Sequence, residues 1–185
     1  MYFKRGVNFG FCLFLCALFM GLLCLKELHA AEDNSPWRMF HSLSGGCVVA
    51  FPSTPHHMKE NLQMDQDEAS VQYDAYVSMG HPKQIYMMLI AKYPMAIDES
   101  KTELSLESFL NGILGKGTKE LIFADFLEIE GHKGMEFFIQ EQAKLFKGRI
   151  LIADNKLYLI AVEAEESSYM EELYHKFISS FHLVR

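Results

Sequence analysis

Apolar and polar positions form four consecutive segments of β type between residues 121 and 165. The segments cover residues 121–129, 135–142, 145–153 and 157–165, and the clearest turns between them are 130–134 and 154–156. Runs of β-branched and aromatic residues bounded by Gly, Asn and Asp are typical of strands joined by short turns. The pattern therefore predicts a β-meander.

Earlier in the chain the pattern predicts three further strands. Residues 47–51 are a short apolar run that ends at Pro52, and residues 71–79 alternate between apolar and polar positions. Residues 85–93 are apolar at both alternating sets of positions, which is typical of a central strand. The polar stretch from 56 to 69, which follows two prolines, predicts a loop.

Two segments have a helical period instead. Apolar residues recur at three- and four-residue intervals over 106–114 and again over 170–178, which places them on one helical face. Ser105 is placed to cap the first helix, and Ser168 with Glu171 has the spacing of a capping box for the second.

The helices carry one apolar stripe each, whereas two of the strands are apolar on both faces. A sheet covered by helices buries the apolar stripes of the helices and both apolar faces of these strands. We therefore expect an α+β domain over residues 37–185, with a largely antiparallel sheet in an α/β/α sandwich. Residues 31–36 are small, polar and acidic, and they suit a short tether to this domain.

The N-terminus has the pattern of an export signal. Lys4 and Arg5 precede an uncharged apolar run from 7 to 25, and a short polar stretch follows it. The run is also long enough to cross a bilayer. Residues 1–30 are therefore expected to be a signal peptide or a retained membrane anchor, and both readings predict an exported chain, either periplasmic or secreted, or anchored at the inner membrane.

The charge and the cysteine content limit which partners the chain can bind and how its fold can be stabilised. The formal net charge of −7 becomes −9 when Lys4, Arg5, Lys26 and Glu27 leave with the signal. An acidic surface is repelled by phosphate backbones, so no nucleic acid is expected as partner, and membrane contact is expected only through residues 7–25. Cys47 is then the remaining cysteine, so the exported domain must be held together by its core.

Several stretches resemble PsbP-like domains. Gly46 to Pro52 is similar to their opening strand, residues 131–136 resemble their middle hairpin, and 149–158 followed by 177–181 resemble their last hairpin and helix. The resemblance covers residues 37–184. It implies a binding or assembly module without a shared catalytic site, and it carries over no functional residue. The polar stretch 56–70 departs from the pattern.

Candidate ligand-binding residues are few. His56 and His57 are imidazole donors of the kind that copper or zinc accepts, but adjacent histidines on a strand do not point at one metal ion. Tyr73, Tyr76 and Tyr86 are candidates for the lining of a ligand groove, although strands also favour tyrosine for packing alone. No cofactor is predicted.

Candidate catalytic residues are fewer still. Cys47 lies in a predicted strand, where a packed core thiol is the expected state, and an exposed nucleophile or an intermolecular disulfide is the alternative. Glu128, Glu130 and Glu136 border a predicted turn and offer carboxylates for acid or base catalysis. The sequence contains no Walker loop, no Gly-x-Ser-x-Gly motif and no His-Glu-x-x-His motif.

These features favour an exported, non-enzymatic binding or assembly module of the bacterial cell envelope. Its partner is expected to be an envelope protein or a small ligand. A small hydrolase or metal-dependent enzyme that uses His56, His57 or Cys47 is the alternative, and an envelope structural protein cross-linked through Cys47 is a third.

Overall fold

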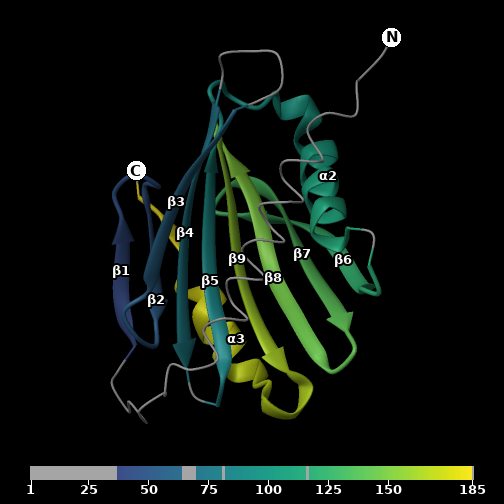
Figure 1. The fold of residues 1–185 in the computed structure, drawn as a ribbon. Helices are drawn as coiled ribbons and strands as arrows, with labels where there is room; N and C mark the ends of the chain where they lie inside the picture. The colour runs from purple at the N-terminus through teal and green to yellow at the C-terminus, as the bar shows by residue number, and fades with distance from the viewer. Residues whose placement is uncertain (1–36, 64–69, 81, 116, 185) are drawn as a thin grey trace.

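The computed structural model describes residues 37–63, 70–80, 82–115 and 117–184 (Figure 1). The predicted signal and tether, residues 1–36, lie outside them. The strands are β1 (Arg38–Ser42), β2 (Cys47–Phe51), β3 (His56–Gln63), β4 (Ser70–Gly80), β5 (Gln84–Lys92), β6 (Glu120–Ile129), β7 (His132–Glu141), β8 (Lys144–Ala153), β9 (Lys156–Glu165) and β10 (His182–Leu183). The helices are η2 (Glu99–Lys101), α2 (Thr102–Leu114), η3 (Glu166–Ser168) and α3 (Glu171–Ser179).

Seven of the strands form one antiparallel sheet in the order β3-β4-β5-β9-β8-β7-β6. The strands β6, β7, β8 and β9 are consecutive neighbours in this sheet, so the predicted β-meander is confirmed. β9 then pairs with β5, which closes the meander onto the earlier hairpin. The prediction of a largely antiparallel sheet is also confirmed.

Each face of the sheet has its own apolar cluster because side chains alternate along a strand. One face carries the buried residues of α2, including Leu106 and Phe109, against inward-facing residues of β4, β5, β7, β8 and β9. The other face carries Tyr174 and Phe177 of α3 together with buried residues of β2. A small sheet in the order β1-β2-β10 thus shares the second face with α3. The molecule is mostly β with two α-helices, and a description of it as α/β/α omits this small sheet.

The two central strands contribute to both clusters. In β5, Met87 and Leu89 face the α2 side, whereas Tyr86 and Met88 face the α3 side. The predicted central position of residues 85–93 is therefore confirmed. Because β5 and β9 contribute buried side chains to both clusters, the packing on the two faces depends on the same two strands.

The prediction of a loop over residues 56–69 was wrong for residues 56–63, and residues 64–69 lie outside the described part of the chain. Residues 56–63 form β3, which pairs along its whole length with β4. Seven of its eight residues are exposed, so the strand lacks the apolar alternation that identifies a strand in a sequence. Its backbone pairing with β4, and not its side-chain pattern, makes this segment a strand.

Both predicted helix caps were wrong. The first helical segment begins earlier, where the Asp98 carboxylate accepts a hydrogen bond of 3.0 Å from the backbone N–H of Ser100, and Ser105 lies within α2. The second helix begins at Glu171 after Met170, and the Ser168 hydroxyl donates to the Glu165 carbonyl instead.

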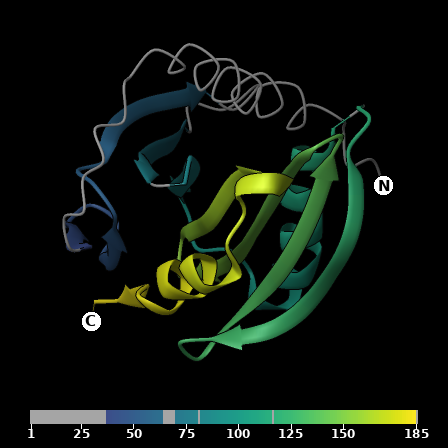
Figure 2. The ribbon, with the colours of Figure 1, turned by 90° about the horizontal axis from the view of Figure 1, so that it is seen from below.

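The hairpin of β6 and β7 curls over the α3 face of the sheet and reaches the C-terminal end of α3 (Figure 2). Its turn is built for this tight reversal. Glu130 and Gly131 have φ angles of 54° and 80°, and two successive positive φ values are the mark of a two-residue turn that suits the twist of a hairpin. Among the described residues, no helix is long and apolar enough to span a membrane.

Candidate functional site

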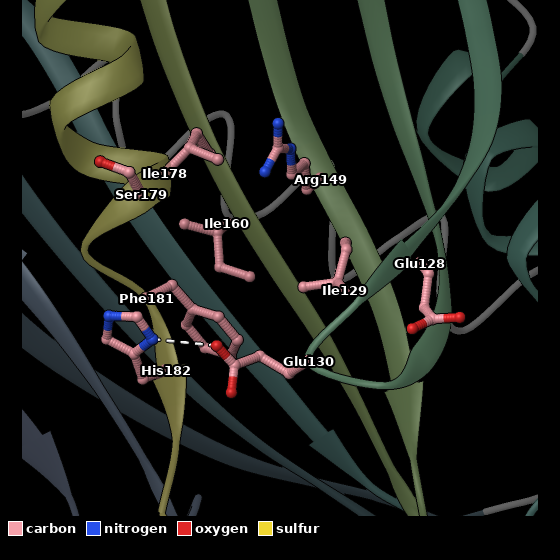
Figure 3. Close-up of a pocket in the computed structure, with 9 residues that line it drawn as sticks. All are labelled: Glu128, Ile129, Glu130, Arg149, Ile160, Ile178, Ser179, Phe181 and His182. Atoms are coloured by element: carbon pink, nitrogen blue, oxygen red, sulfur yellow. Dashed lines mark hydrogen bonds and ion pairs between the residues drawn. The ribbon is translucent and has the colours of Figure 1, made fainter.

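A pocket of about 230 Å³ lies where the β6–β7 turn approaches the C-terminal end of α3 (Figure 3). Its base is formed by β8 and β9, and its walls come from the turn on one side and from α3 and β10 on the other. The lining residues are Glu128, Ile129, Glu130, Arg149, Ile160, Ile178, Ser179, Phe181 and His182.

The base and inner wall of the pocket are apolar. Ile160, Ile178 and Phe181 are each at least 94% buried, and Ile129 is partly buried against the same cluster. These side chains surround the centre of the pocket in Figure 3. An apolar group that enters the pocket therefore exchanges water for hydrocarbon, which is the main source of affinity in such sites.

Arg149 is the charged group of the inner pocket, and it is held in place by two neighbours. Its Nη2 donates to Oε2 of Glu136 at 3.3 Å, across from it on β7. The Tyr174 hydroxyl of α3 donates to the other oxygen of Glu136 at 2.6 Å. Burial and then the hydrogen bond to Glu136 raise the pKa of Tyr174, so the phenol keeps the proton that it donates.

This chain of contacts leaves one donor of Arg149 unused. Its Nε is buried and has no hydrogen-bond partner among the described residues. A buried donor without a hydrogen-bond partner is costly. The pocket thus combines an apolar base with an arginine whose position is set by Glu136 and Tyr174.

A hydrogen bond between a histidine and a glutamate lies at the rim. Nδ1 of His182 on β10 lies 2.9 Å from Oε1 of Glu130 in the β6–β7 turn, and both side chains are substantially exposed (Figure 3). The contact joins residues that are 52 positions apart and ties the C-terminal strand to the hairpin. It sets the spacing between the two walls.

The predicted metal ligands lie elsewhere, on the edge strand β3. His56 and His57 are neighbours on a strand, so their side chains point to opposite faces. Nε2 of His57 is 2.7 Å from Oδ1 of Asp74, and its ring stacks on Tyr76 with centroids 4.4 Å apart. Among the described residues, no group of three or more His, Cys, Asp or Glu side chains is placed to hold a metal ion.

The three tyrosines predicted to line a groove are divided by the sheet. Tyr73 belongs to the cluster under α2, whereas Tyr76 and Tyr86 belong to the cluster under α3 and the small sheet. All three are at least 95% buried. A single groove lined by all three is not formed, and their rings pack within the two cores.

The residues of the enzymatic alternative are placed poorly for catalysis. Cys47 is buried, and burial raises the pKa of its thiol to about 12, so it stays protonated and is a poor nucleophile. The hydroxyl of Ser44 donates to Asp74 at 3.3 Å, and His57 contacts the same carboxylate. In a hydrolytic triad the histidine lies between the nucleophile and the acid, and here the acid lies in the middle.

Sequence reasoning named Glu130 and Glu136 only as carboxylates and did not find Arg149 or His182. A signal for Arg149 does exist. It is a charged residue in the mostly buried strand β8, and an acidic residue occupies the facing position of the preceding strand. His182 has no comparable signal, because its partner is set by where the C-terminus lies in the fold.

No protein-family model and no curated protein matches the chain. Among solved structures, the fold is similar to the solution structure of cyanobacterial PsbP (CyanoP) from Synechocystis sp. PCC 6803, with a TM-score of 0.49 and 13% identity. The match covers 84% of this chain and 98% of that chain. This solved structure is a PsbP protein, the kind of domain that the sequence resembles. The similarity concerns the backbone arrangement and assigns no role to any residue.

Proposed function

We propose that the chain is an exported, non-enzymatic binding or assembly module of the bacterial cell envelope, and that the pocket between α3 and the β6–β7 turn accepts one side chain of a partner protein. Export is inferred from the sequence pattern of residues 1–30, and membrane contact would come only through residues 7–25 if that segment is retained. The proposal requires no cofactor.

The size of the pocket is the observation that carries this proposal. Sites for small organic ligands and cofactors usually enclose roughly 300–1,000 Å³. The volume of about 230 Å³ is smaller than that range and suits a single apolar side chain. Protein interfaces commonly draw most of their affinity from one or a few such anchors in desolvated pockets. An envelope protein is therefore favoured over a small ligand as the partner.

The polar groups of the pocket suit an anchor that is attached to a backbone. The apolar base formed by Ile160 and Phe181 would receive the side chain, while the guanidinium of Arg149 beside it would donate to a carbonyl of the partner. A buried carboxylate is less suitable, because Glu128 and Glu130 line the same pocket and Glu136 is bonded to Arg149. The anchor is therefore expected to be uncharged.

Site-specific photocrosslinking in living cells tests the proposal. A benzophenone amino acid replaces Ser179, an exposed residue of the pocket, in the full-length chain. The expected result is one discrete adduct with an envelope protein after irradiation. The matched control carries the same group at Glu107, an exposed position on α2 on the opposite side of the sheet, and should give no such adduct.

A pocket-filling variant separates pocket binding from mere proximity. Ile129→Trp places a larger ring at the pocket wall, and it should suppress the Ser179 adduct while the abundance of the chain is unchanged. If the adduct persists at full yield, or if the Glu107 probe gives the same adduct, the pocket does not hold the partner.

A further inference from the structure

The strand β6 is the last strand of the seven-stranded sheet, and its outer side is an open edge in the part of the chain that the structure describes. It pairs with β7 alone, with a bulge between Leu121 and Phe123 and regular pairing from Phe123 to Ile129. The backbone N–H and C=O groups on the outer side of such a strand can pair with another extended chain. The edge is separate from the pocket described above.

The two faces of β6 differ in character. Leu121 and Phe126 lie opposite Ile139 and Met135 of β7, so they are on the α2 face, and they are 40% and 48% exposed. Ile122, in the bulge, is 45% exposed.

The exposed side chains of the other face are acidic, although Phe123 and Leu127 also lie half-buried on it and the exposed Glu128 lies on the α2 face. Asp125 lies opposite Glu136, whose carboxylate contacts Tyr174 of α3, and Glu120 lies opposite Gln140 on the same face. Both acidic residues are exposed, and the strand contains no basic residue.

The strand at the opposite edge of the sheet, β3, differs from β6 in its exposed side chains. β3 carries Lys59 at its centre, and most of its exposed side chains are polar or charged, with Met58 as its exposed large apolar residue. A central lysine is a common way to prevent an edge strand from pairing with another chain. β6 has no lysine, and it exposes large apolar residues.

The acidic face of β6 also limits what can pair with it. In an antiparallel pair of two copies, the acidic residues of one β6 would face an equally acidic strand, and like charges across strands are destabilising. A second copy of this chain is therefore disfavoured. A strand with basic residues on one face and apolar residues on the other complements both faces of β6.

We infer that β6 binds an extended segment of a partner protein as an additional antiparallel or parallel strand, with Lys or Arg side chains over Glu120 and Asp125 and apolar side chains beside Leu121 and Phe126. Main-chain hydrogen bonds contribute affinity in such strand addition, and the alternating side chains determine specificity. This inference does not depend on the pocket.

A pair of peptides tests the inference on the full-length protein. The probe is an end-capped decapeptide of alternating valine and lysine, and the matched peptide has glutamate in place of lysine. Amide hydrogen exchange and NMR chemical shifts are measured along β6. The lysine peptide should protect amides of β6 and shift their resonances, and it should bind at least about tenfold more tightly than the glutamate peptide, because opposite charges attract across the pair.

A matched pair of charge reversals identifies the edge. Asp125→Lys should weaken binding of the lysine peptide about fivefold or more, whereas Glu60→Lys on β3 changes the net charge equally and should leave it within about twofold. Phe126→Ser keeps all charges and removes an apolar contact, so it should also weaken binding of the lysine peptide. Equal binding of the two peptides, protection that maps to β3 rather than β6, or equal effects of the two reversals would each overturn the inference. Failure of the Ser179 crosslink alone leaves the β6 inference intact, since that experiment reports only on the pocket.

Discussion

At the scale of single residues, Tyr174 connects the helix α3 to the charged centre of the site. Its ring is fully buried, and its hydroxyl bonds to the Glu136 oxygen that does not contact Arg149. The phenol thus completes the hydrogen bonding of a partly buried carboxylate. Loss of that hydroxyl leaves Glu136 with one partner fewer and frees the Arg149 side chain to move.

Tyr174→Phe is expected to lower the free energy of unfolding by about 1.5–3 kcal/mol, the usual range for a hydrogen bond to a charged group. Chemical denaturation followed by circular dichroism measures the change. Tyr169→Phe is the matched control: its hydroxyl bonds to the exposed carboxylate of Glu171, which water can solvate, so a loss of about 0.5 kcal/mol or less is expected. Equal losses in the two variants would show that the partly buried position of Glu136 does not strengthen its hydrogen bond to Tyr174.

At the scale of elements, the β6–β7 hairpin brings the pocket wall to α3. Its turn has two residues with positive φ, and Glu130 in that turn holds His182 of β10. A Cβ at Gly131 would meet no atom within 4 Å, so space is not what requires glycine there. The requirement is conformational, because left-handed backbone is unfavourable for most side chains.

Gly131→Ala is therefore expected to destabilise the protein by about 1–2 kcal/mol. Because the turn would be strained, amide exchange should also rise in β6 and β7 and at His182. Gly131→Asn is the comparison, since asparagine tolerates left-handed backbone, and it should cost clearly less. Thermal unfolding and hydrogen exchange measure both variants. If asparagine costs as much as alanine, the positive φ is not the reason for the glycine.

At the scale of the whole molecule, the central strands join two cores into one folding unit. Trp37, the single tryptophan of the chain, packs edge-on against Tyr86 on the α3 face, with ring centroids 5.0 Å apart. Leu106 of α2 is fully buried on the opposite face. Both faces depend on β5 and β9, so tryptophan fluorescence should report loss of packing on the far side as well.

Leu106→Ala should lower the free energy of unfolding by about 2–5 kcal/mol, because it leaves a cavity in the α2 core. The unfolding midpoints from Trp37 fluorescence and from far-ultraviolet circular dichroism should shift together, as in a two-state transition. Leu104→Ala is the control, since Leu104 on the same helix is 63% exposed and its loss should change little. Separate midpoints for the two signals would mean that the faces unfold independently.

The sequence by itself determined the meander, the central strand and the positions of both helices, because alternation and helical period are local consequences of which side chains face a core. It did not determine β3, whose exposed side chains carry no such period and which is a strand only because β4 supplies the backbone partners. The helix starts also escaped it, since both aspartate and serine can cap a helix and only the path of the backbone decides that Asp98 does so and that Ser105 lies within α2.

The candidate site was decided almost entirely by tertiary structure. Glu136 and Tyr174 are 38 positions apart, and Glu130 and His182 are 52 apart, so no local pattern links them. They meet because the β6–β7 hairpin curls over the face that α3 covers. Distances between such residues follow from the order and twist of the strands, and these properties come from pairing across the whole sheet. Residue types alone predicted candidate chemistry at His57 and Cys47, and the fold holds one against Asp74 and buries the other.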